Sequence, residues 1–317
     1  MHCMVCTGTN VSNDTLGSDP KVFKKRNTVW RKKTEKMKKT MIVLICITLL
    51  VCFSGSDVYA KSKKSGNQVA RGVRIKISNK STYTPKIKGK IVTDKKQYRY
   101  FVPKNKKEFK NGFVTYKSSV YFVNKAGKIK TGWMKYKGSY YYLDRKTGKM
   151  AFSKKVDGIK INKYGVAKLT PYLKKKVDVY IEARKVIEAT SVPRDSVSKR
   201  LFKAYKYISQ FSYVRFRTYK EAIVTNPDDW DIVFANDIFL DNNTGCCISS
   251  SAAFAYVAVE LGYKNVSLCS DTEHAWVDIG GRMYDLIFAK NIDFKKNYNA
   301  VYTDEKKANP PVKKTIN

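Results

Sequence analysis

Residues 245–285 read GCCISSSAAFAYVAVELGYKNVSLCSDTEHAWVDIGGRMYD, and this stretch decides how the second half of the chain folds. Its first part, from Cys246 to Leu261, is apolar, rich in small residues and of helical length. Gly262 follows, and glycine is the residue that most readily adopts the left-handed conformation that ends a helix. The sequence therefore predicts a buried helix that begins at the cysteines and ends at Gly262.

A β-hairpin is predicted directly after this helix. Two strand-like segments, 274–279 and 282–288, flank a Gly-Gly pair, which is typical of a two-residue hairpin turn. In that register Trp276 pairs with Asp285, so His274 and Asp285 lie on one face as diagonal neighbours, about 7–8 Å apart at the backbone. A carboxylate can bridge that distance to an imidazole. The other face carries the apolar residues expected to pack inward, Ala275, Val277, Ile279, Tyr284 and Leu286.

The cysteines at the predicted helix start are candidates for a catalytic nucleophile. Peptide dipoles at a helix start favour the thiolate, the nucleophilic form of cysteine. Beyond residue 60 the chain holds three cysteines (246, 247 and 269) and a single histidine, His274, so a cysteine that needs a histidine base has one candidate. Zinc sites usually take cysteines two to four residues apart rather than adjacent, so a metal site is disfavoured and no cofactor is expected.

These motifs, taken in order, resemble the transglutaminase-like superfamily over roughly residues 172–300. The motifs that carry the resemblance are Gly245-x-Cys247, Leu261-Gly262-Tyr263, His274-Ala275-Trp276 and Tyr284-Asp285. Members of the superfamily use a papain-type Cys-His-Asp triad. The resemblance implies an α+β fold with helices packed on an antiparallel sheet. It implies Cys247 as nucleophile, His274 as base and then acid, and Asp285 as the group that orients the imidazole, with the adjacent Cys246 as the alternative nucleophile.

The segments before the cysteines show a weaker pattern. Apolar residues at helical spacing predict amphipathic helices at 171–190 and 195–212. Segment 213–244, which contains Asn226-Pro227 and several aspartates, predicts an irregular connection into the helix of the cysteines.

Residues 91–170 contain an internal repeat. Gly112-Phe113 recurs as Gly132-Trp133, and Tyr121-Phe122-Val123 recurs as Tyr141-Tyr142-Leu143, both at a 20-residue step. A degenerate copy lies at 158–165 and a partial one at 98–101. A unit this small cannot bury its own apolar face, so stacked β-hairpins are expected.

The repeats resemble the choline-binding-type repeats of Gram-positive surface proteins, in which aromatic residues of successive hairpins form cages for a quaternary ammonium group. The resemblance implies binding to a cell-wall polymer, either peptidoglycan or teichoic acid. The alternative is that the rings only fill the hairpin cores. The residues at the corresponding positions are Phe113, Tyr121, Trp133, Tyr141, Tyr142 and Tyr164.

The formal net charge of +37 is unevenly distributed. Residues 61–170 hold 31 Lys and Arg against 4 Asp and Glu, whereas residues 221–289 hold 2 against 11. The basic half favours a polyanionic partner. Because the chain is expected to be exported, that partner is expected to be a wall polymer and not a nucleic acid.

Export is predicted from the N-terminal region. Lys38-Lys39, the apolar run 41–53 and small residues before Ala60 form the three parts of a secretory signal peptide. The run of 13 residues is too short for a membrane span, so no transmembrane anchor is expected after cleavage. The predicted divisions are an upstream segment and signal peptide (1–60), a flexible basic linker (61–90), the hairpin repeats (91–170), a transglutaminase-like catalytic domain (171–305) and a loose tail (306–317).

Together these features predict a secreted enzyme at the cell wall of a Gram-positive-type bacterium. The expected reaction is cysteine-dependent acyl transfer that hydrolyses peptide or amide bonds of a peptide or protein substrate. Two alternatives stay open: a protein-glutamine gamma-glutamyltransferase that forms isopeptide cross-links, and a non-catalytic adhesin.

Overall fold

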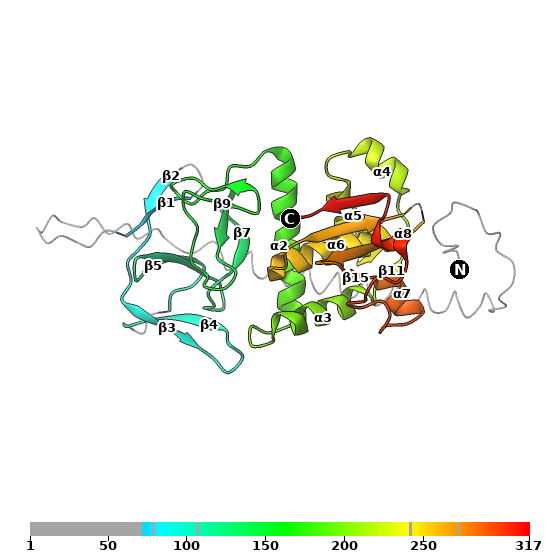
Figure 1. The fold of residues 1–317 in the computed structure, drawn as a ribbon. Coiled ribbons are helices and arrows are strands. Elements are labelled where there is room, and N and C mark those ends of the chain that lie inside the picture. Colours follow the sequence, from blue (N-terminus) through cyan, green and yellow to red (C-terminus); the bar gives the residue numbers. More distant parts are fainter. Residues whose placement is uncertain (1–71, 78–79, 106–107, 241–242, 272) are drawn as a thin grey trace, which may run out of the picture. The chain divides into compact units, whose positions relative to one another are not determined.

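The computed structural model describes residues 72–77, 80–105, 108–240, 243–271 and 273–317, which belong to one compact unit (Figure 1). The predicted signal peptide and the segment upstream of it lie outside the described residues, as does the first part of the predicted linker. Among the described residues, no helix combines the length and the apolar character that a membrane span requires.

The first half of the described chain is a series of antiparallel β-hairpins. The paired strands are β1 (Arg74–Ile77) with β2 (Lys80–Tyr83), β3 (Gly89–Thr93) with β4 (Arg99–Pro103), β5 (Gly112–Tyr116) with β6 (Ser119–Val123), β7 (Gly132–Tyr136) with β8 (Ser139–Leu143), and β9 (Lys155–Val156) with β10 (Ile159–Lys160). Hairpins β5–β6 and β7–β8 have the same register, because Gly112 faces Val123 and Gly132 faces Leu143. The predicted 20-residue repeat of hairpins is confirmed.

Two-residue turns join the strands of hairpins β5–β6, β7–β8 and β9–β10. In the β7–β8 turn both central residues have positive φ, 47° at Lys137 and 78° at Gly138. Such turns match the natural twist of a hairpin, and glycine adopts their backbone conformation without steric cost.

Hairpins β5–β6 and β7–β8 are each tied to the preceding hairpin by a backbone hydrogen bond from the segment that follows them. The amide of Ile129 donates to the carbonyl of Arg99, and the amide of Met150 donates to the carbonyl of Val120, both at 2.8 Å. These bonds, together with the shared apolar clusters, stack the hairpins in chain order.

The predicted flexible linker is wrong for the part that the structure describes, because residues 74–77 and 80–83 pair as strands β1 and β2. Ile75 is fully buried against Phe113 and Tyr141. The hydroxyl of Tyr141 also donates to the carbonyl of Lys76. A single apolar residue among lysines gives little periodic signal, but burying it anchors the strand to the next hairpins.

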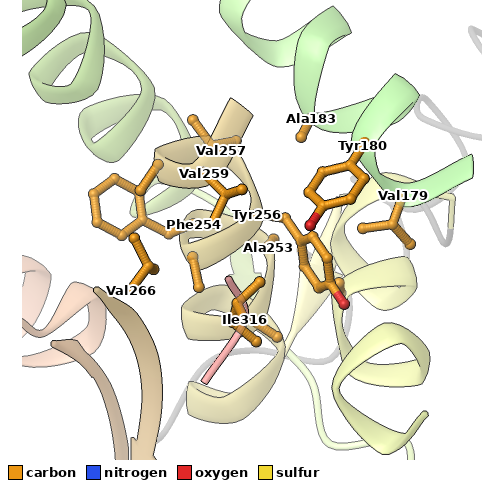
Figure 2. Packing of buried hydrophobic residues seen from close by; sticks show 14 of the residues in the cluster. Val179, Tyr180, Ala183, Ala253, Phe254, Tyr256, Val257, Val259, Val266 and Ile316 are labelled. Atoms are coloured by element: carbon orange, nitrogen blue, oxygen red, sulfur yellow. The ribbon is translucent and has the colours of Figure 1, made fainter. Parts of the chain in front are cut away.

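Helices make up most of the second half. They are α2 (Pro171–Thr190), α3 (Val197–Ile208), α4 (Tyr219–Thr225), α5 (Trp230–Phe239), α6 (Cys247–Leu261), α7 (Leu286–Asn291) and α8 (Glu305–Ala308). Every residue of α6 is buried, and the helix ends at Gly262 with φ of 99°, as predicted. The rings of Tyr256 on α6 and Tyr180 on α2 meet edge to face, with centroids 5.4 Å apart (Figure 2).

The predicted irregular segment 213–244 is wrong, since it contains α4 and α5. Helix α5 is buried on most of its sides, so it lacks the one-sided pattern that identifies a surface helix.

A four-stranded antiparallel sheet completes this half, in the order β15 (Arg282–Tyr284), β14 (Ala275–Ile279), β13 (Val266–Ser270) and β16 (Val312–Thr315). A short parallel pair, β11 (Ser212–Tyr213) with β12 (Thr244–Gly245), lies just before α6. The predicted loose tail is wrong: β16 pairs with β13, and Ile316 is buried. The apolar face predicted for the hairpin is confirmed, because its five residues join the main core with α6.

An ion-pair network joins the hairpins to the helices. Glu260, at the end of α6, is fully buried between Arg184 of α2 and Arg145, which follows β8. Arg145 also pairs with Asp157 at 2.7 Å, and Asp157 accepts a hydrogen bond from the indole of Trp133. The hairpins and the helices therefore share polar contacts as well as an apolar core.

Candidate active site

His274 and Asp285 form a buried pair. The Nε2 atom of His274 lies 2.7 Å from Oδ2 of Asp285, and the two residues are 4% and 0% exposed. The other carboxylate oxygen of Asp285 accepts the amide of Phe288 at 3.0 Å, which caps α7. Both oxygens of Asp285 are thus used, one to hold the imidazole and one to begin a helix.

The sequence predicted this pairing, but the geometry differs from the prediction. Strand β15 ends at Tyr284, and Asp285 is the N-cap of α7 instead of a strand residue paired with Trp276. Aspartate is among the preferred N-cap residues, and its bond to Phe288 competes with continuing the ladder. The predicted strand to Phe288 is therefore wrong, while the His274–Asp285 contact is present.

His274 is held by its backbone and by its ring. Its amide donates to Oδ1 of Asp271 at 2.5 Å, and its carbonyl accepts the hydroxyl of Ser270 at 2.8 Å. Its ring stacks on Phe288, with centroids 4.2 Å apart and planes 9° apart. These contacts fix the imidazole before any ligand arrives.

Helix α6 presents its two cysteines on different faces. Cys246 is the N-cap, and Ser249, three residues later, donates to Asp237 of α5 at 2.7 Å. Cys247 is the first helical residue, and Ser251, four residues later, donates to the carbonyl of Ala275 at 3.2 Å. Residues three or four apart share a helix face. Cys246 therefore lies on the side of α5, and Cys247 shares the helix face of Ser251, which contacts β14 at the residue that follows His274.

Cys246 and Cys269 differ in acidity. The pKa of Cys246 is lowered to about 6, chiefly by hydrogen bonding with the Cys247 thiol and also by Ser249, against the opposing effect of burial. Burial raises the pKa of Cys269 to about 12. A thiolate at neutral pH is thus favoured at Cys246 and disfavoured at Cys269, which packs with Trp276 and Met283.

A polar chain behind the cysteines was not predicted from the sequence. Arg217 pairs with Asp237 at 2.6 Å, Asp237 accepts the hydroxyl of Ser249, and the sulfur of Cys246 lies 3.5 Å from that hydroxyl oxygen. The serine run at 249–251 was the available signal, because serines are unusual inside a fully buried helix unless they are hydrogen-bonded.

Gly245 makes room for this arrangement. A Cβ at this position would lie 2.5 Å from the Cβ of Ser249 and 3.1 Å from Ile238. Only glycine fits there without displacing the helix start, which explains why it precedes the cysteines.

The aromatic residues predicted to bind the wall are core residues of the hairpins and of the adjoining helical region. Phe113, Tyr121, Trp133, Tyr141 and Tyr142 are all at most 5% exposed. Trp133 and Tyr142 belong to the main core with α2 and α6, and Tyr141 stacks edge to face on Phe113. Tyr164 is partly buried. Their burial fits the alternative in which the rings fill the hairpin cores, and their binding of a wall polymer stays a prediction.

Metal ligation was weighed from the sequence as a rival use of these side chains. Within the described ranges, no three His, Cys, Asp or Glu side chains are grouped so that they could hold a metal ion.

Comparison with known proteins gives matches among solved structures. No protein-family model matches the chain, and no curated protein matches it. Among solved structures, a choline binding domain from Streptococcus pneumoniae is similar at 24% identity and a TM-score of 0.24, over 26% of this chain and 95% of that one.

Two longer proteins match over part of their length. Choline binding protein F from S. pneumoniae, solved with a peptidoglycan analogue, is 22% identical with a TM-score of 0.23, over 30% of each chain. The multimodular pneumococcal cell wall endolysin from phage Cp-1, solved with choline, is 24% identical with a TM-score of 0.24, over 27% of this chain and 26% of that one. Each of these matches covers less than a third of this chain, and the stacked β-hairpins are shown by the chain's own strand pairing.

Proposed function

We propose that this chain is an exported, wall-associated cysteine acyl-transfer enzyme that hydrolyses peptide or amide bonds through Cys247, His274 and Asp285. The observation that carries the proposal is the buried His274–Asp285 pair beside the start of α6. A histidine held by a carboxylate in a buried site is the arrangement that general-base activation of a thiol requires.

The hydrogen bond to Asp285 assigns the roles of the two ring nitrogens. With Nε2–H donated to the carboxylate, Nδ1 is the nitrogen that takes the proton of the Cys247 thiol. The carboxylate stabilises the imidazolium that results. Burial strengthens this interaction, because little water screens it.

In the proposed reaction the thiolate of Cys247 attacks an amide carbonyl, and backbone N–H groups at the start of α6 stabilise the oxyanion. His274 then protonates the leaving amine as the carbon–nitrogen bond breaks. Water, deprotonated by His274, resolves the thioester to a carboxylic acid and the free thiol.

Cys247 is favoured over Cys246 as the nucleophile by its helix face. Its face contacts β14 next to His274, whereas Cys246 faces α5. We assign Cys246 a supporting role, in which it shares a hydrogen bond with Cys247.

Wall association is supported by charge and by the stacked hairpins. Residues 61–170 carry 31 basic and 4 acidic side chains, a surplus that attracts anionic polymers. Sedimentation of the full chain with purified cell walls tests this part. Binding that falls steeply with added salt is expected, and no binding at low salt would refute it.

Alkylation with iodoacetamide at neutral pH, followed by peptide mapping, tests the chemistry. Fast labelling of Cys247 that is lost in His274→Ala is expected, while Cys246→Ser, the matched control, should keep it. Equal and slow labelling of all three cysteines beyond residue 60 would refute the enzyme.

A labelled primary amine, added with a glutamine-bearing protein, separates hydrolysis from cross-linking. Incorporation of the amine would favour the gamma-glutamyltransferase alternative. The burial of Cys247, which is 3% exposed, is the observation that favours the non-catalytic adhesin, and the alkylation experiment decides that question.

A further inference from the structure

A cavity of about 330 Å³ lies between the hairpin turns and helices α2 and α3. The turn before β4, the segment between β6 and β7, and Arg145 line one side. The C-terminal part of α2 and Arg200 of α3 line the other side. No residue of the proposed triad takes part, so the cavity is separate from the chemistry at Cys247.

The lining is strongly basic. It contains seven Lys and Arg side chains and one acidic side chain, that of Glu188. Glu188 is paired with Lys130, while Asp157 and Glu260 balance Arg145 and Arg184. The remaining four cations form no ion pair with any described residue; they are Arg99, Lys128, Lys146 and Arg200.

Arg200 is the most unusual of the four. Its Nε atom is buried and has no hydrogen-bond partner among the described residues. Burial, and then repulsion from Arg184, lower the pKa of its guanidinium. A buried guanidinium nitrogen without an acceptor is costly, and the Arg200 side chain also lines the cavity, so an anion bound there would compensate its charge.

We propose that this cavity binds a phosphate group, with Arg200, Arg99 and Lys128 as its principal ligands. The guanidinium group of arginine can donate two parallel hydrogen bonds to two phosphate oxygens. A phosphate group carries about two negative charges, which would neutralise part of the positive charge of this cavity. The volume is at the low end for ligand sites, which suits a phosphate with a small attached group.

Thermal unfolding of the full chain in inorganic phosphate, against chloride at equal ionic strength, tests the site. The Tm should rise with phosphate concentration beyond the effect of chloride, as expected for a ligand that binds only the folded state. No difference between the two salts would overturn the proposal.

Variants locate the site. In Arg200→Gln the phosphate affinity should fall by about tenfold or more, the scale of one charge-assisted hydrogen bond, and the phosphate-dependent rise in Tm should shrink with it. Arg194→Gln makes the same change at an exposed arginine outside the cavity and should keep the rise. Lys128→Gln, a second lining variant, should weaken binding as well. Equal affinity in all three variants would overturn the assignment.

The source of the phosphate is tested by adding a soluble poly(glycerol phosphate) chain. Binding that free phosphate displaces, and that Arg200→Gln loses, would identify the phosphodiester of an anionic polymer. Binding of inorganic phosphate alone would identify a free phosphate site. Cys247→Ser should behave as the wild type in every arm, so this proposal can fail while the proposed enzyme stands, and the reverse also holds.

Discussion

Replacing Glu260 by glutamine should cost this protein a large part of its stability. Glu260 is fully buried, and its Oε1 accepts from Nε and Nη2 of Arg184 at 2.8 and 2.6 Å. Its Oε2 accepts from Nε and Nη2 of Arg145 at 3.0 and 2.8 Å. Glutamine keeps the shape but removes the negative charge and replaces one acceptor with a donor.

The size of the loss follows from what each arginine retains. Arg145 is partly exposed and keeps Asp157, whereas the side chain of Arg184 is 6% exposed and keeps no carboxylate among the described residues. Removing one partner of a buried ion pair typically costs about 3–5 kcal/mol, because the other charge stays buried. We expect the free energy of unfolding to fall by about that amount.

Urea unfolding followed by circular dichroism measures this change. Glu188→Gln is the matched control, since its pair with Lys130 is exposed and should contribute less than about 1 kcal/mol. A fall of under about 1 kcal/mol for Glu260→Gln would mean that water reaches Arg184 and would refute the reasoning.

Three further changes test the site. Gly245→Ala places a Cβ 2.5 Å from the Cβ of the serine four residues later. It should lower the free energy of unfolding in urea by roughly 1–3 kcal/mol, and an unchanged midpoint would contradict the packing. Asp285→Asn can still cap α7 but loses the charge beside His274, so alkylation of Cys247 should slow by about tenfold; an unchanged rate would remove the carboxylate from the mechanism. In the folded protein the pKa of Cys246 is lowered to about 6. The Cys246 thiolate therefore stabilises the folded state fully above the pKa of an unfolded thiol, and this stabilisation is lost as the pH falls through 6. Unfolding under reducing conditions should therefore show a loss between pH 8 and pH 5 that Cys246→Ser lacks.

Some elements were predictable because they depend on neighbours in sequence. The end of α6 depends on Gly262, which has φ of 99°, and the hairpin turn depends on Gly280 and Gly281, with φ of 60° and 81°. The contact of His274 with Asp285 also followed, since a hairpin of that register brings the two residues near each other whichever way the second strand ends.

Other elements depend on partners far away along the chain. Asp231 suggested a loop, but inside α5 it pairs with Lys314. Strand β16 exists because it adds to the edge of β13, nearly fifty residues earlier in the chain. Neither contact leaves a periodic pattern in its own segment.

The repeats also carried a signal that was not used. The side chains of Asp94, Asn124, Asp144 and Asn162 each accept backbone amides from the next few residues, in the turn that follows a strand. Such an Asx turn therefore recurs near the ends of β3, β6, β8 and β10.

Helix α6 has a consequence for how this protein can evolve. One end of the helix carries Cys247 and the other end carries Glu260, which Arg145 contacts from the hairpin side. A gene fragment that begins at residue 171 would encode a protein in which Glu260 keeps Arg184 but loses Arg145, and in which the side of α2 that packs on Trp133 and Tyr142 is exposed. The helices thus depend on the hairpins for part of their packing. We therefore expect the two halves to be inherited together.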